Sequence, residues 1–139
     1  MKQRTTPTFE TVIPRLPVAD LQRTVEFYCG RLGFERDVVW PEETPTFAIL
    51  CRDSIRLGFF ERSEHQPGPI GYAELYIQVA DSLQVYELIH AHLPIEWGPD
   101  VYSYGRREFA FRDPDGYLVI LTEPTEETPT TREPQDGDP

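Results

Sequence analysis

Aromatic and acidic side chains alternate with apolar ones in residues 74–78, a pattern that predicts a β-strand. Because successive side chains of a strand point to opposite faces, Glu74 and Tyr76 share one face and the apolar residues between them share the other. The apolar face must pack under a helix, which leaves Glu74 and Tyr76 on the open side. The same parity places Ile120 of a later strand beside them. Aromatic rings next to a carboxylate suit a flat, positively charged ligand, since stacking and cation–π contact add to charge pairing.

Other large aromatic residues extend this candidate binding site. The predicted ligand-binding set consists of one acid, six aromatic residues and one aliphatic residue: Trp40, Phe47, Phe59, Glu74, Tyr76, Tyr102, Tyr104 and Ile120. The alternative is that these rings fill the core or an interface between subunits, and for Phe47 that alternative carries more weight. Tyr102 and Tyr104 precede a strand in a loop, a position where binding residues are common.

Side chains suited to metal binding or nucleophilic catalysis are sparse. His90 and His92 are two residues apart on a predicted helix, so they point to different sides and cannot chelate one ion together. His65 lies in a predicted linker. Cys29 and Cys51 lack a CxxC spacing, and we expect both to be reduced and unreactive. The sequence therefore predicts no metal and no cofactor.

An internal repeat positions these residues. Residues 18–35 match residues 79–96 at an offset of 61, with Val-Ala-Asp at the start of both segments. In the first copy Leu21, Val25, Tyr28 and Leu32 follow the spacing of one helix face. Asp20 and Asp81 are the predicted N-caps. Gly33 and Pro94 are the predicted helix ends.

Each predicted helix is preceded by one strand and followed by three. The first half has strands at 12–18, 36–40, 46–51 and 55–60, and the second at 74–79, 95–97, 108–112 and 117–122. The chain is therefore predicted to be an α+β protein with two βαβββ repeats in a single domain at 10–122. Its halves are 10–61 and 74–122, joined by a linker at 62–73, and an acidic, proline-rich tail at 123–139 is predicted to be disordered.

The charge balance limits the classes of partner. The chain has 139 residues and a formal net charge of −11, and the tail supplies six of its 24 acids. This balance disfavours nucleic acid as a partner and favours cationic ligands. No apolar run reaches the roughly 20 residues that cross a bilayer, and the first residues lack the apolar region of a secretory signal. We therefore expect no membrane partner and a cytoplasmic location.

Three segments carry a family resemblance: LPVADLQRTVEFYCGRLGFERD at 16–37, RDPDG at 112–116 and YGRREFAFRDPDGYLVILTE at 104–123. They resemble the vicinal oxygen chelate superfamily, which includes glyoxalase I, extradiol dioxygenases and bleomycin-resistance proteins. The resemblance covers residues 10–123. It implies that each βαβββ half forms a curved, incomplete barrel whose concave face lines a cavity.

The resemblance also indicates where the enzymes of the superfamily hold a metal. The four corresponding positions here are Ile13, Glu74, Ile120 and one near Gly58 or Phe59. Only Glu74 offers a donor atom, because aliphatic carbon does not coordinate a divalent cation. The resemblance thus argues against a metal-dependent lyase or dioxygenase, although that class stays open as an alternative.

Among the branches without metal ligands, the sequence is most similar to the bleomycin-resistance proteins, which bind a drug without altering it. Those relatives are dimers with clefts between the subunits, so the resemblance implies a homodimer that sequesters a small aromatic, cationic compound. They commonly have Trp where this chain has Tyr104. A transcription or scaffold partner that binds no ligand is a third possibility.

Overall fold

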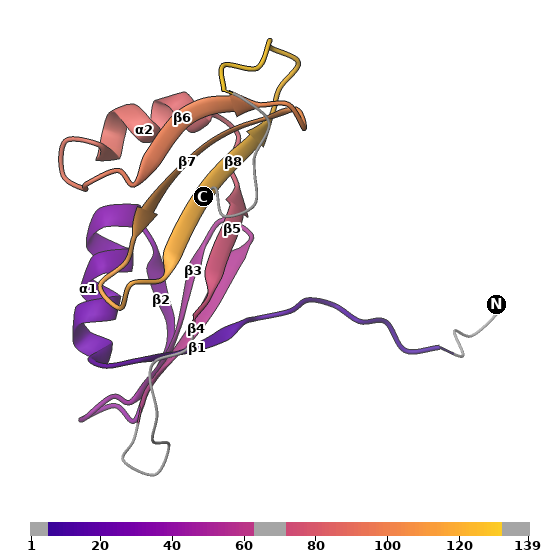
Figure 1. Cartoon of the computed structure of the whole chain (residues 1–139). Coiled ribbons are helices and arrows are strands. Elements are labelled where there is room, and N and C mark those ends of the chain that lie inside the picture. Colours follow the sequence, from indigo (N-terminus) through magenta and orange to yellow (C-terminus); the bar gives the residue numbers. More distant parts are fainter. Residues whose placement is uncertain (1–5, 63–71, 132–139) are drawn as a thin grey trace.

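The computed structural model describes residues 6–62 and 72–131, and it shows two similar halves (Figure 1). The first half contains β1 (Arg15–Val18), α1 (Leu21–Leu32), β2 (Glu35–Trp40), β3 (Phe47–Arg52) and β4 (Ile55–Glu61). The second contains β5 (Glu74–Gln78), α2 (Ser82–Ile89), β6 (Trp97–Tyr102), β7 (Arg106–Arg112) and β8 (Leu118–Pro124). The prediction of two βαβββ repeats is confirmed.

The two sheets have matching topologies. The first has the strand order β1-β4-β3-β2 and the second the order β5-β8-β7-β6. In each sheet the first strand pairs in parallel with the last, and the remaining pairs are antiparallel. Neither four-stranded sheet closes on itself, as expected for incomplete barrels.

Both helices begin at the predicted caps. The carboxylates of Asp20 and Asp81 accept hydrogen bonds from the backbone N–H groups of Arg23 (3.2 Å) and Gln84 (3.1 Å). Gly33, in a left-handed conformation (φ 70°), ends α1 as predicted. The prediction that α2 runs to Pro94 is wrong. It ends at Ile89, where the chain tightens into a turn.

One side of each sheet packs against a helix and forms the core. The predicted face of α1 is buried, and the ring of Tyr28 lies 4.8 Å from that of Phe59 on β4. Phe109 and Phe111 of β7 supply the corresponding buried rings of the second half. The helices thus cover one face of each sheet and leave the other face for a different role.

The first and last strands have other bounds than the sequence predicts. β1 begins at Arg15 instead of residue 12, because pairing with β4 starts where Arg15 meets Gly58. Residues 6–14 instead lead away from the sheets (Figure 1). Glu123 belongs to β8, and Thr130 exchanges backbone and side-chain hydrogen bonds with Val101 at 2.8 Å. The tail is therefore ordered at least to Thr130.

Two of the predicted segments are not fully described. Most of the predicted linker at 62–73 and the end of the tail at 132–139 lie outside the described residues. Within residues 6–62 and 72–131, neither helix has the length and apolarity needed to cross a bilayer.

Candidate functional site

The candidate site lies on the side of the second sheet that faces away from α2, here called the second-sheet face. Register across β5, β8, β7 and β6 brings alternate side chains of all four strands onto it. These residues are Glu74, Tyr76, Gln78, Leu118, Ile120, Thr122, Arg106, Glu108, Ala110, Arg112, Trp97, Asp100 and Tyr102. Tyr104, from the β6–β7 turn, joins them.

Glu108 is the central group of this face. Only 2% of its surface is exposed, although it is an acid on a face that no helix covers. Its Oε1 accepts a hydrogen bond from the Tyr104 hydroxyl at 2.5 Å, and its Oε2 accepts one from the Tyr76 hydroxyl. The Thr122 hydroxyl donates in turn to the Tyr76 oxygen at 3.3 Å. Two phenols therefore hold the carboxylate in place, as a buried acid requires.

The electrostatics of the cluster keep both phenols protonated. Burial, followed by the hydrogen bond to Glu108, raises the pKa of Tyr104 well above its ordinary value. The same two causes raise the pKa of Tyr76. Each residue nevertheless leaves about half of its surface accessible, with 52% of Tyr104 and 53% of Tyr76 exposed. The cluster thus combines a buried negative group with accessible aromatic surface.

Three aromatic rings form a continuous wall along β6 and the turn after it. Tyr102 and Tyr104 stack with their centroids 5.5 Å apart and their planes at 10°. Trp97 meets Tyr102 edge-on at 6.0 Å. Among the buried side-chain polar atoms of the described residues, Trp97 Nε1 alone has no hydrogen-bond partner. A buried indole N–H without an acceptor is costly and suits a ligand that supplies one.

The floor of the site is apolar and its edge carries a cation. Ala110, Leu118 and Ile120 form a small buried cluster against which Trp97 packs. The Arg106 guanidinium lies 5.9 Å from the centroid of the Tyr76 ring and donates to Gln78 Oε1 at 3.0 Å. This face is therefore aromatic and apolar around one buried acid, with Arg106 at its rim.

The structure divides the predicted site residues between two sheets. Tyr76, Tyr102, Tyr104 and Ile120 lie on the second-sheet face together. Glu74 shares that face but lies at its edge strand, exposed, and accepts a hydrogen bond from the Tyr72 hydroxyl at 2.9 Å.

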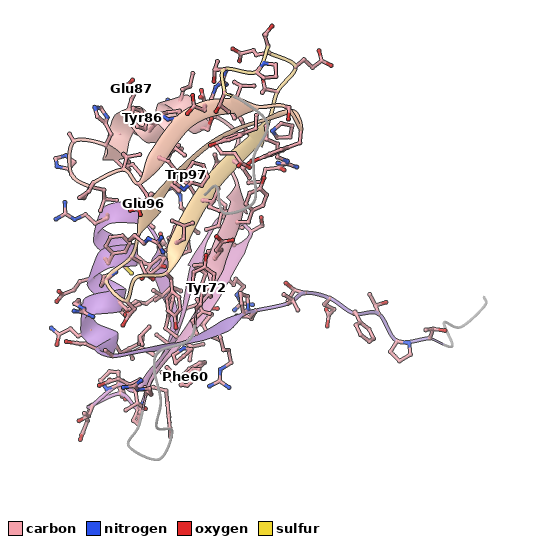
Figure 2. The ribbon with its side chains drawn as sticks, viewed as in Figure 1. Phe60, Tyr72, Tyr86, Glu87, Glu96 and Trp97 are labelled. Atoms are coloured by element: carbon pink, nitrogen blue, oxygen red, sulfur yellow. The ribbon has the colours of Figure 1, made fainter. Side chains whose placement is uncertain are left out.

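Trp40 and Phe47 pair with each other on the first sheet, on the side away from α1, here called the first-sheet face. Trp40 is 66% exposed, and the Arg15 guanidinium lies 4.8 Å from the centroid of Phe47 and 5.2 Å from that of Phe60. Figure 2 shows Phe60 and Trp97 toward opposite ends of the molecule. Within one chain these aromatic residues and the second-sheet face are therefore separate groups.

The placement of Phe59 among the site residues is wrong. Its side chain is fully buried against Tyr28 on the helix side of β4. The sequence contains a signal for this placement, because Ile55, Leu57 and Phe59 form an apolar set on one face of the strand and Arg56 lies on the other. The neighbour with the opposite parity, Phe60, lies on the first-sheet face instead.

Glu108 was not predicted as a site residue, although the sequence contains a signal for it. In residues 106–112 (RREFAFR), Phe109 and Phe111 share one parity and Glu108 has the other. Because Phe109 and Phe111 must face the core, Glu108, which directly precedes Phe109, must face the other way. The parity rule that assigns Glu74 and Tyr76 to the open side of their strand therefore assigns Glu108 to the open side of this one.

The positions that would hold a metal do not offer a suitable donor set. Ile120 offers only carbon, and the residue that pairs with Glu74 in the sheet is Leu118, which offers only carbon as well. Among the described residues there is no group of three or more His, Cys, Asp or Glu side chains arranged to hold a metal ion. Cys29 and Cys51 are free, and burial raises the pKa of the Cys29 thiol, which disfavours the reactive thiolate.

Comparisons with known proteins agree with this fold. The family model of the Glyoxalase/Bleomycin resistance protein/Dioxygenase superfamily matches residues 9–121, and the chain belongs to this superfamily. A bleomycin resistance protein of Geobacillus stearothermophilus is 28% identical over 130 residues, covering 77% of this chain and 91% of the relative. A bleomycin resistance protein of Staphylococcus aureus strain MRSA252 matches to the same extent, with 28% identity over 77% of this chain and 91% of its own length.

Two solved structures share the fold at low sequence identity. TioX from Micromonospora sp. ML1 superposes with a TM-score of 0.72 and 19% identity, covering 82% of this chain and 98% of its own. TnmS3, an antibiotic binding protein from Streptomyces sp. CB03234, has a TM-score of 0.70 and 19% identity, covering 86% of this chain and 100% of its own.

Proposed function

We propose that this protein binds and sequesters a small aromatic compound that carries positive charge, such as a bleomycin-type antibiotic, and leaves it chemically unchanged. The observation that carries the proposal is the buried Glu108 carboxylate, held by two phenols and bordered by stacked rings on an uncovered sheet face. The names of the curated relatives support binding of a drug of this class.

The physical argument combines stacking with charge. The half-exposed rings of Tyr76 and Tyr104 offer flat surface to a ligand. Each oxygen of Glu108 has a second lone pair beyond the one that accepts from tyrosine, so a cationic donor that enters between the rings can also bond to it. The net charge of −11 attracts a cation toward the protein. Arg106 at the rim favours a ligand that carries its charge at one end.

Two chains are needed to bring all of the aromatic residues together. We infer a homodimer with two ligand clefts, in which the aromatic residues of the first-sheet face of one protomer cover the second-sheet face of its partner. Trp40 is 66% exposed in the single chain, which is unusual for a tryptophan and typical of an interface or ligand contact. This arrangement would unite Trp40 and Phe47 with Glu74, Tyr76, Tyr102, Tyr104 and Ile120 in one site.

A metal-dependent lyase or dioxygenase is the alternative from the same superfamily. The isoleucines at positions 13 and 120 argue against it, because they give the metal no donor. Elemental analysis of the purified protein tests this point. About one transition metal per chain, retained after washing with a chelator, would favour the enzyme and contradict the proposal.

Titration calorimetry with a bleomycin-type drug tests the binding proposal directly. Replacing Glu108 with Gln keeps the shape of the side chain and removes its charge, so it should weaken drug binding by on the order of 1–3 kcal/mol, the scale of a charge-assisted hydrogen bond. Glu74→Gln is the matched control at the exposed edge, where the loss should be smaller and should disappear in added salt.

Folding of each variant is checked by thermal unfolding, and Tyr104→Phe, which removes one donor to Glu108, provides a second variant of the same site. Equal affinities of the wild type and Glu108→Gln, or no binding by either, would contradict the proposed function. Recovery of the drug unaltered by mass spectrometry distinguishes sequestration from catalysis.

A further inference from the structure

A cavity of about 330 Å³ lies between the two halves, on the helix side of the sheets and away from the second-sheet face. It opens beside the start of α2 and the β3–β4 turn. Its walls are mostly apolar and come from both halves: Leu32, Phe34, Ile55, Ile77, Val79, Ala80, Val85, Ile89 and Leu121, with Arg52, Asp53, Ser54, Gln78, Asp81 and Gln84. This volume is at the lower end of the range for small-molecule pockets.

The internal repeat shows what fills the corresponding place in the other half. At the offset of 61, Ala80 and Val85 correspond to Ala19 and Thr24. Around the latter pair the five-residue β7–β8 turn closes the gap. The Asp115 carboxylate accepts from the Ala19 N–H at 2.9 Å and from the Thr24 hydroxyl at 3.4 Å.

An aromatic ring occupies the rest of that gap. Tyr117, the last residue of the same turn, is only 2% exposed, and its hydroxyl donates to the Pro17 carbonyl at 2.5 Å. The chain thus closes one of its two equivalent gaps with a carboxylate and a phenol ring from its own turn.

The β3–β4 turn cannot do the same for the second gap. Only Asp53 and Ser54 separate the two strands, and the Asp53 side chain is 90% exposed at the rim of the cavity, so it does not fill the space. The residue corresponding to Tyr28 is the smaller Ile89, which enlarges the space further. The cavity therefore has the walls of the first gap without its ring and without its carboxylate.

We propose that this cavity is a second binding site, which takes a small aromatic carboxylate in place of the missing turn. The ring would pack against Val79, Val85 and Ile89, and the carboxylate would approach the N–H of Ala80 as Asp115 approaches that of Ala19. Arg52 lines the same cavity, with its side chain about half exposed and one guanidinium nitrogen held by the Leu32 carbonyl at 2.7 Å.

The two acids at the rim of the cavity already have partners. Asp81 already accepts a hydrogen bond from the Gln84 N–H, and Asp53 faces Arg52 with 3.8 Å between its Oδ2 and the arginine Nε. The site is independent of the proposed function, since the two lie on opposite sides of the second sheet and share only Gln78 among the residues named for each. One can fail without the other.

A heteronuclear NMR titration of the full chain with phenylacetate tests the proposal, with the neutral phenylacetamide as a matched probe. We expect phenylacetate to shift the backbone signals of Ala80, Val85 and Ile89, and phenylacetamide to bind about tenfold or more weakly, as for loss of a charge-assisted hydrogen bond. No shifts at these residues at millimolar phenylacetate, shifts confined to the second-sheet face, or equal binding of the two probes would overturn it.

Substitutions at Val85 make the test specific. Val85→Thr, which is nearly isosteric, supplies the hydroxyl that Thr24 gives to Asp115, and should tighten phenylacetate binding by about threefold without tightening phenylacetamide. Val85→Phe should fill the cavity and abolish binding, whereas Leu88→Phe, on an exposed part of α2 outside the cavity, should leave binding unchanged. Unchanged binding in both Val85 variants would overturn the proposal, and Val85→Thr alone decides it if Val85→Phe does not fold.

Discussion

The two phenols that donate to Glu108 differ from ordinary tyrosines in their ionisation, and this difference can be measured without any ligand. Burial and the bond to Glu108 raise the pKa of both Tyr76 and Tyr104. Tyr72 makes a corresponding bond to Glu74, which raises its pKa as well, but on an exposed part of the chain. Glu108 therefore raises the pKa of Tyr76 and Tyr104, and Glu74 raises the pKa of Tyr72.

Glu108→Gln should lower the pKa of Tyr76 and Tyr104 toward the ordinary tyrosine value, because a neutral amide repels a phenolate less than a carboxylate does. Glu74→Gln should lower the pKa of Tyr72 alone. Spectrophotometric titration of phenolate absorbance distinguishes these outcomes. An unchanged titration curve for Glu108→Gln would contradict the geometry of the cluster.

The same shifts have a consequence for stability. A tyrosine whose pKa is raised by folding keeps its proton in the native state after the unfolded chain has lost it. Its contribution is complete below the unfolded pKa and is lost as pH rises through the folded pKa. The unfolding free energy of the wild type should therefore fall in alkaline solution, and more steeply than that of Glu108→Gln.

At the scale of the elements, a bulge in β6 sets the position of Trp97. The register with β7 shifts between Trp97 and Asp100, at Gly98. Gly98 has a left-handed φ of 83°, and a Cβ there would lie 2.3 Å from the Glu108 carbonyl oxygen. The strand can pass this close to β7 only with glycine at that position.

Gly98→Ala should therefore destabilise the protein by about 2–4 kcal/mol, since it adds both backbone strain and a clash with a backbone atom. Gly30→Ala is the matched control: it lies in α1 with nothing within 4 Å of the added carbon, and it should stabilise by about 0.5–1 kcal/mol. Chemical denaturation measures both. A similar effect of the two substitutions would contradict this role of the bulge.

A buried hydrogen bond joins α1 to the β7–β8 turn. The Tyr28 hydroxyl donates to Asp113 Oδ2 at 2.7 Å, while Asp113 Oδ1 accepts from the N–H groups of Asp115 and Tyr117. Tyr28→Phe should cost about 1–3 kcal/mol of unfolding free energy, because one carboxyl oxygen then lacks its buried donor. A loss below the experimental error would show that the two halves do not depend on this bond.

The same carboxyl group should give a pH dependence in acid. Burial raises the pKa of Asp113 above its ordinary value, although its three donors act in the opposite direction. The native state therefore holds this proton more tightly than the unfolded chain, and the stabilisation is lost as pH rises through the folded pKa. The unfolding free energy of the wild type relative to Asp113→Asn should decrease from acid toward neutral pH, and a constant difference would contradict this.

The comparison of prediction and structure separates local from non-local signals. The caps at Asp20 and Asp81 and the helix face around Tyr28 were predictable because they depend on residues within one or two turns of each other. The position of Trp97 was not, because it depends on a bulge and on the partner strand. Alternation identified the open side of β5, and the same rule places Phe59 in the core, since Ile55 and Leu57 share its face and Arg56 lies on the other.

At the scale of the whole molecule, exposed apolar side chains gather outside the core of the single chain. Phe9 is 95% exposed and Val12 is 83% exposed on the segment that leads away from the sheets in Figure 1. Trp40 is 66% exposed on the first sheet. Large apolar side chains that a single chain leaves in water are typical of subunit interfaces. Two-fold pairing is the commonest symmetry that would cover them.

We therefore predict that the protein sediments as a dimer at micromolar concentration, and that the double substitution Phe9→Ser with Val12→Ser weakens the dimer. Removing two fully exposed side chains costs a single chain almost nothing, so the thermal stability of a monomer should not change, whereas covering them in a dimer is worth about 1.5–3 kcal/mol each. The dissociation constant from sedimentation should then rise by at least tenfold.

Leu88→Ser, at a side chain that is 68% exposed on α2, is the control and should leave the dimer intact if residues 6–14 and the first sheet form the interface. A monomeric wild type would contradict the assembly and leave Trp40 and Phe47 outside the drug site, while the Glu108 cluster of the single chain could still bind the ligand on its own.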